Sequence, residues 1–203
     1  MIAKALRHVR RHGATTTVRY GWARLRNRYH TWRLRALGVR VGRNVWFEGP
    51  LDITIIKGGS ITVGDGCNFG KYAHLKVSGG HIVLKDNVKV NRFCIVQAHR
   101  SVTIEHDVLT APGVHIMDAN HNFETDMPTK TADELEGLPA SPVVIGAHAW
   151  LGSGVRVLAG VHIGAHAVIG AGAVVTSDIP EHAVAVGVPC RVIKYRDRVQ
   201  VNR

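Results

Sequence analysis

Three features are scarce in this 203-residue sequence, and each scarcity argues against a class of protein. Only three cysteines are present, outside any CxxC pair, so neither a disulfide framework nor a cysteine-rich metal cluster is expected. No apolar run approaches the ~20 residues of a membrane span, and no signal-peptide pattern opens the chain. We therefore expect a reduced, cytoplasmic protein, neither secreted nor membrane-spanning.

Acidic residues are absent from positions 1–47, which carry twelve of the 26 Lys and Arg residues. Within this basic extension, one apolar stripe has helical spacing: Val18, Trp22, Leu25, Tyr29 and Trp32. Two interpretations stay open, because the stripe can cap an end of the folded core or contact an anionic membrane surface. Aromatic and basic residues do not alternate as in a single-strand binding groove, so no nucleic-acid partner is expected.

Apolar residues recur at every sixth position in the C-terminal half of the sequence. One series is Ile145, Leu151, Val157, Ile163, Ile169 and Val175. The second is Ala149, Val155, Val161, Ala167, Ala173 and Ile179. A six-residue period with glycine at a fixed phase is typical of a hexapeptide parallel β-helix, in which three units form one triangular coil. The fold class predicted is all-β.

The same phase continues more loosely upstream, where Cys67 and Cys94 fall at inward positions and are expected to be small buried apolar groups. The longest interruption covers residues 117–142, and a loop of this length without a period of its own is usually functional or disordered. His121 stands at its root, close to Asp118 and Asn120. An imidazole, with an unperturbed pKa near ~6.5, suits proton transfer at neutral pH.

The sequence resembles the left-handed β-helix acetyltransferases, in the branch of maltose, galactoside and polysaccharide O-acetyltransferases. Four segments carry the resemblance: VNRFCIV (90–96), TAPGVHIMDANHNF (110–123), PVVIGAHAWLGSGVRVLAGVHIGAHAVIGAGAVVTSDIP (142–180) and AVGVPCRVIKY (185–195). It implies a left-handed helix and a homotrimer. The domain boundaries predicted are a basic amphipathic helical extension at 1–37, the β-helix at 38–180 with its projecting loop 117–142, and a C-terminal tail at 181–203.

The resemblance also implies a reaction. Acetyl-CoA is the expected co-substrate, with no metal, and a saccharide hydroxyl is the expected acceptor. His121 is the general base, and the hydroxyl attacks the thioester directly in a ternary complex. Asn91 matches a family asparagine near the acceptor, although an asparagine at a left-handed corner of the β-helix is an equal alternative. Asp118 is a candidate for orienting the imidazole.

Seven further residues match the family's coenzyme-binding pattern: Trp150, Gly152, Ser153, Ala171, Thr176, Arg191 and Lys194. In that pattern the Ser153 N–H is the oxyanion donor, the backbone at Ala171 binds the pantetheine arm, and the last three residues meet the adenine and phosphates. Ser177 departs from it where a lysine is common, and Cys190 departs where an alanine is common, so the detailed phosphate contacts are open.

Three other functions stay open at this stage. An amine in place of a hydroxyl would make the protein a sugar N-acetyltransferase. A zinc enzyme like the β-helical carbonic anhydrases would use His81, His115 and His121, but the separation of 34 positions between the first two is not a multiple of eighteen. A non-catalytic scaffold binding nucleic acid through its basic arm is the third.

Overall fold

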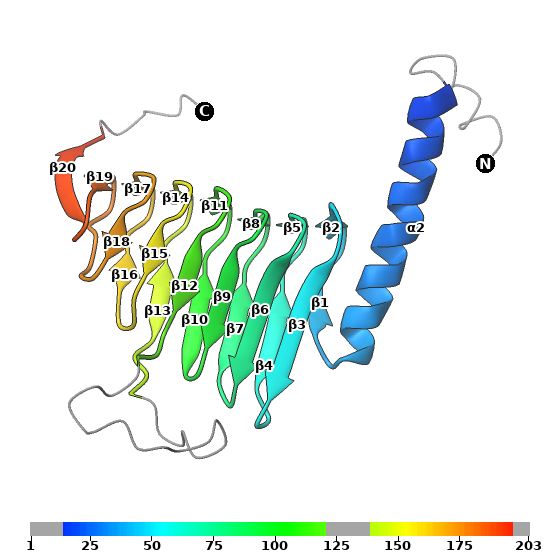
Figure 1. The fold of residues 1–203 in the computed structure, drawn as a ribbon, viewed down its shortest axis with the longest axis horizontal. Helices are drawn as coiled ribbons and strands as arrows, with labels where there is room; N and C mark the ends of the chain where they lie inside the picture. Colours follow the sequence, from blue (N-terminus) through cyan, green and yellow to red (C-terminus); the bar gives the residue numbers. More distant parts are fainter. Residues whose placement is uncertain (1–13, 121–138, 197–203) are drawn as a thin grey trace, which may run out of the picture.

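A computed structural model describes residues 14–120 and 139–196, so the predicted base His121 lies outside the described residues. The described residues form one long helix, α2 (Ala14–Ala36), followed by a solenoid of short parallel strands (Figure 1). These strands form three sheets, which are the faces of a triangular prism. The prediction of an all-β parallel β-helix with an N-terminal helix is confirmed.

Each turn of the chain adds one strand to each sheet. Sheet A contains β1 (Arg40–Val41), β4 (Ser60–Val63), β7 (His81–Leu84), β10 (Ser101–Ile104), β13 (Val143–Ile145) and β16 (His162–Ile163). Sheet B contains β2 (Trp46–Phe47), β5 (Asn68–Phe69), β8 (Lys89–Val90), β11 (Leu109–Thr110), β14 (Trp150–Leu151), β17 (Val168–Ile169), β19 (Ala183–Val186) and β20 (Arg191–Tyr195). Sheet C contains β3 (Leu51–Ile56), β6 (Ala73–Ser78), β9 (Ile95–Ala98), β12 (His115–Met117), β15 (Arg156–Val157) and β18 (Val174–Val175).

The six-residue period places two small or branched apolar side chains inside the prism in each unit, one from each of the two series. Val157 and Val175, one coil apart, are register partners, and both are fully buried. Cys67 and Cys94 are also buried in this core, as predicted. Burial raises the pKa of the Cys67 thiol to about 11 and also raises that of Cys94. These cysteines are therefore neutral core residues.

The three edges of the prism are the corners where the chain passes from one sheet to the next. We call them the A–B edge (for example residues 146–149), the B–C edge (91–94 and 152–155) and the C–A edge (the corner after Met117 and after Val175). Backbone N–H groups at each corner donate to carbonyls of the neighbouring coil, as Gly152 N does to the oxygen of Ile169 at 2.8 Å. Residues stacked along one edge are therefore held in fixed register.

Helix α2 covers the open end of the first coil, next to β1 and β2 (Figure 1). The face that packs there carries Leu34 and His30, both buried, with the His30 ring 5.2 Å from the ring of Phe47. The predicted aromatic stripe is not the capping face. Trp22 and Trp32 are 69% and 67% exposed. The end of the prism presents backbone groups as well as apolar rings, and a polar side chain of the helix binds one of them: the N–H of Phe47 donates to the side-chain oxygen of Asn27.

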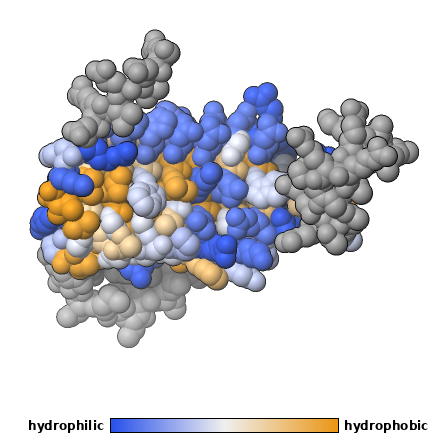
Figure 2. Space-filling model, turned by 90° about the horizontal axis from the view of Figure 1, so that it is seen from above, coloured by the Kyte–Doolittle hydropathy of each residue, from blue (hydrophilic) through white to orange (hydrophobic). Residues whose placement is uncertain are grey.

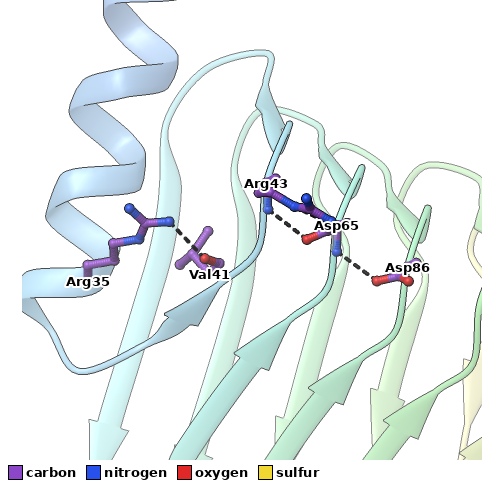
Figure 3. Close-up of polar contacts among 5 residues, drawn as sticks. All are labelled: Arg35, Val41, Arg43, Asp65 and Asp86. Atoms are coloured by element: carbon purple, nitrogen blue, oxygen red, sulfur yellow. Dashed lines mark hydrogen bonds and ion pairs between the residues drawn. The ribbon is translucent and has the colours of Figure 1, made fainter.

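Arginines tie the helix and the first coils together (Figure 3). The Arg35 guanidinium donates to the carbonyl oxygen of Val41 at 2.9 Å. Beyond it, the Arg43 N–H donates to Asp65 and the Asp65 N–H donates to Asp86, both at 2.8 Å. Hydrogen bonds from Arg43 hold the pKa of the Asp65 carboxyl below its ordinary value. Side-chain contacts of this kind close the end of the solenoid, where the sheets have no further strand to pair with.

The prism extends past residue 180, the boundary predicted from the sequence. Strand β19 still pairs in parallel with β17 and reaches Val186, and β20 then turns back antiparallel to it. No helix within residues 14–120 and 139–196 combines the length and apolar character needed to cross a bilayer.

Candidate active site

Trp150 stands on the outer surface of β14. Its side chain is 48% exposed, while the next residue, Leu151, points into the core. Trp150 lies between Leu109 and Val168 of the adjacent strands. The predicted outward position is what the structure shows, so the indole is available to a ligand on the surface of the prism.

Gly152 and Ser153 form the B–C edge directly after this strand. A side chain at Gly152 would place its Cβ 2.6 Å from the backbone nitrogen of Ala171, so only glycine lets the two coils approach this closely. The carbonyl of Ser153 accepts the N–H of Gly172 at 2.8 Å. Ser153 and Ala171 are therefore neighbours on one edge, about 5 Å apart along the prism.

The backbone N–H groups of Ser153 and Ala171 are free to bind a ligand. Within the described part of the chain neither donates a hydrogen bond, and both residues are exposed. Two amide donors fixed on successive coils match what the sequence predicts for an oxyanion donor and a pantetheine contact. The roles themselves stay predictions.

Asn91 lies on the same B–C edge, two coils before Gly152. Its side-chain oxygen accepts the N–H of Arg92 at 2.8 Å, and its own N–H donates to the hydroxyl of Thr110 at 3.1 Å. The left-handed backbone angle at this corner belongs to Phe93, with φ 56°, so a left-handed conformation is not the reason for asparagine here. Within the described residues the side-chain amide N–H₂ donates no hydrogen bond, and its role toward an acceptor stays a prediction.

Asp118 lies at the root of the long loop, on the C–A edge. Its carboxylate is fully buried and accepts the N–H groups of His99 and Arg100, each at 2.7 Å. Its own carbonyl accepts the N–H of Ser141. The observed contacts thus close a corner and join the two sides of the loop. The orienting role toward His121, which lies outside the described residues, stays a prediction.

The predicted site residues divide between two edges of one chain. Asn91, Gly152, Ser153 and Ala171 share the B–C edge, whereas Thr176 follows β18 and lies on the C–A edge with the loop root. Sheet C separates these edges by about 15 Å, because some five residues of strand and corner lie between them. A single chain therefore does not bring the two halves of the predicted site together.

The remaining coenzyme candidates lie on the C-terminal hairpin. Arg191 and Lys194 are exposed in β20, and the Arg191 guanidinium donates to the carbonyl oxygen of Cys190. Figure 2 shows apolar residues gathered toward this end of the prism. Cys190 is buried, and burial raises the pKa of its thiol, so it is no better a nucleophile than Cys94. Direct transfer without an acyl-enzyme stays a prediction.

His81 and His115, which the zinc alternative requires as ligands, do not lie together within one chain. His81 lies in sheet A and His115 in sheet C, and burial followed by the charge of Arg156 lowers the pKa of His115. His106, Asp107 and His148, which no sequence pattern singles out, have ligand atoms within 4.8 Å of one another on the exposed A–B edge. His106 and His148 are 42 positions apart in the sequence, and no six-residue or metal-ligand spacing links them.

The chain is similar to several known proteins. A family model described as bacterial transferase hexapeptide (six repeats) matches residues 142–177. The Escherichia coli (strain K12) protein WbbJ, whose name proposes it as a lipopolysaccharide biosynthesis O-acetyl transferase, is 40% identical over 141 residues, which cover 67% of this chain and 72% of WbbJ. Galactoside O-acetyltransferase of the same strain is 34% identical over 161 residues, covering 79% of this chain and 66% of that enzyme.

A solved structure shows the same fold. AntD, an N-acyltransferase from Bacillus cereus in complex with dTDP-4-amino-4,6-dideoxyglucose and coenzyme A, superimposes with a TM-score of 0.71 at 18% identity, over 83% of this chain and 89% of AntD. At this identity the likeness shows a shared β-helical fold. The chain belongs to the hexapeptide-repeat transferase family and is an acetyltransferase or a closely related acyltransferase.

Proposed function

We propose that the protein transfers the acetyl group of acetyl-CoA to a hydroxyl of a saccharide or glycan precursor. The observation that carries the proposal is the B–C edge, where Gly152 holds the free N–H groups of Ser153 and Ala171 on adjacent coils beside the exposed Trp150. The likeness to two proteins named for O-acetyl transfer supports a hydroxyl acceptor.

The proposed reaction is a single transfer in a ternary complex. His121 takes the proton of the acceptor hydroxyl while its oxygen forms a bond to the thioester carbonyl carbon. The carbonyl oxygen gains negative charge, which the N–H of Ser153 stabilises. The C–S bond then breaks, and the CoA thiolate receives the proton from the imidazolium. The amide of Asn91 helps to hold the acceptor near this edge.

A homotrimer is part of the proposal. Because the B–C edge carries the amide donors and the C–A edge carries Thr176 and the loop root, two copies side by side would complete the site in the groove between them. Size-exclusion chromatography with light scattering tests this directly, since a protein that is monomeric at assay concentration while fully active would exclude a shared site.

The deciding experiment is a turnover assay that measures free CoA thiol. Acetyl-CoA is offered with monosaccharides, oligosaccharides, amino sugars and lipid-linked glycans, and products are located by mass spectrometry and NMR. The proposal expects an ester on a sugar oxygen. A product carrying the acetyl group on nitrogen would establish the N-acetyltransferase alternative instead, and no turnover with any acceptor, together with no acetyl-CoA binding, would overturn both.

A further inference from the structure

Helix α2 presents a continuous aromatic and aliphatic face to solvent. Trp22, Leu25, Tyr29 and Trp32 are each 57–69% exposed. At about 100° per residue they lie on the side of the helix opposite to Leu34, whose side chain is buried against the prism. The apolar face therefore points away from the coils that the helix caps, and no described residue covers it.

Arginines flank this face on the side of the first coil. A cavity of about 770 Å³ lies between α2 and the corner that precedes β2. Its lining residues are Arg24, Asn27, Arg28, Thr31, Trp32, Arg35, Gly42, Arg43, Asn44, Val45 and Trp46. No acidic residue is among them. Arg24 and Arg28 are exposed and, within the described part of the chain, form no ion pair or hydrogen bond.

This combination fits the interface of an anionic bilayer. Trp and Tyr rings favour the headgroup level of a membrane, and a helix with arginines beside such rings lies in the interface plane. Docking a second copy of the same face is disfavoured, because it would place several arginines against arginines without a carboxylate between them. The first acidic residue of the chain is Glu48, so no acid of the extension weakens attraction to lipid phosphates.

We propose that α2 is a membrane-docking element, which lays its aromatic face into an anionic phospholipid surface while lipid phosphates occupy the arginine-lined cavity. This goes beyond the proposed function, because it assigns a partner surface that catalysis on a soluble acceptor would not need. The prism would stand with its first coil toward the bilayer.

Co-sedimentation of the full chain with vesicles tests the proposal. One vesicle preparation is pure phosphatidylcholine, and the other contains about one third phosphatidylglycerol. The protein is expected to pellet with the second at low salt and to be released at high salt, because headgroup attraction is screened. Equal pelleting with both lipids, or none with either, overturns the proposal.

Two double variants separate the two parts of the surface. Trp22→Ser with Trp32→Ser is expected to weaken partitioning at least tenfold, while Tyr72→Ser with Phe93→Ser, which removes two exposed rings from the prism, leaves it unchanged. Arg24→Gln with Arg28→Gln is expected to weaken it about 30-fold. Its control, Lys85→Gln with Lys89→Gln, removes the same charge elsewhere and should weaken it less than threefold.

Several outcomes contradict the proposal. Wild-type pelleting by the tryptophan variant would show that the aromatic face does not dock, and equal losses in both lysine and arginine variants would show attraction by net charge alone. Concentration-dependent self-association that disappears with Trp22→Ser and Trp32→Ser, without vesicle binding, would assign the face to a second copy. Turnover on a soluble acceptor is measured for the tryptophan and arginine variants, because its persistence separates a failed docking surface from a failed catalytic proposal.

Discussion

Replacing Gly152 by alanine tests the candidate edge without removing any functional group. The added Cβ would lie 2.6 Å from the Ala171 nitrogen, 2.9 Å from the Ile169 oxygen and 3.0 Å from the Ala171 Cα. Ordinary contact begins at 3.4 Å, so the backbone nitrogen of Ala171 must move by about 0.8 Å. Gly152 does not have a positive φ, and the cost therefore comes from this contact alone.

The displacement has two consequences of different size. Overpacking between coils costs about 1–3 kcal/mol, which lowers the melting temperature by about 3–10 °C in a chain of this length. The same shift misaligns the N–H groups of Ala171 and Ser153. Loss of the contact made by the Ala171 N–H should weaken acetyl-CoA binding about tenfold. Misalignment of the Ser153 N–H, the proposed oxyanion donor, should lower kcat by ~10²–10³-fold.

Gly146 supplies a matched control on the A–B edge. Its Cβ would meet the Ala165 nitrogen at 2.5 Å and the Ile163 oxygen at 2.8 Å, which is nearly the same clash. Gly146→Ala should therefore lose similar stability but keep acetyl-CoA affinity within about twofold. Calorimetric titration and thermal melts are run on both variants. If the two lose affinity equally, or if Gly152→Ala binds like the wild type despite its lower melting temperature, the B–C edge is not the coenzyme site.

Three further substitutions or conditions give separate tests. His121→Ala should lower turnover by ~10²–10⁴-fold with acetyl-CoA affinity kept within about twofold, and retention of half the activity would disprove its role as base. Asp118→Asn can accept only one of the two buried N–H groups that its carboxylate now holds, so urea denaturation should show a loss of about 1–3 kcal/mol; an unchanged midpoint would contradict the corner-closing role. Burial, and then the charges of Arg33 and Arg26, lowers the pKa of His30 in the folded state, so its contribution is complete above about pH 6.5 and lost as pH falls through the folded pKa. As the pH falls below about 6.5, the melting temperature should decrease less steeply for His30→Gln than for the wild type. Parallel curves for the two proteins would refute this role of His30.

The sequence predicts the prism well because every six-residue unit meets the same packing requirement. In each six-residue unit two inward positions must be small or branched to fit between three sheets, so the spacing alone predicts that Val157 of the first series and Ala173 of the second are buried. The corner residues of the candidate site are also predictable where a contact between coils restricts them. Gly152 is such a case, because no side chain fits there.

Other features depend on contacts of the helix and of irregular corners with the coils, which the six-residue period does not determine. Helical spacing correctly groups Trp22, Leu25 and Trp32 on one face but does not tell which face meets the prism. Burial of His30 and Leu34 follows from the shape and hydrogen-bonding groups of the first coil. The buried contacts of Asp118 could not be predicted either, because its partners lie nearly one coil earlier at an irregular corner.

The two proposals together constrain the acceptor. If the exposed face of α2 lies in the bilayer, the prism axis runs along the membrane normal, and the B–C edge rises away from the surface. Strand β14 is four strands beyond β2 in sheet B, which places Ser153 about 30 Å from the bilayer when the thickness of the helix is included. The sugar that reaches this edge is then remote from the lipid end of its carrier. A lipid-linked glycan too short to span the gap should be acetylated in detergent but not in intact vesicles, and equal rates in both would show that the prism does not stand in this orientation.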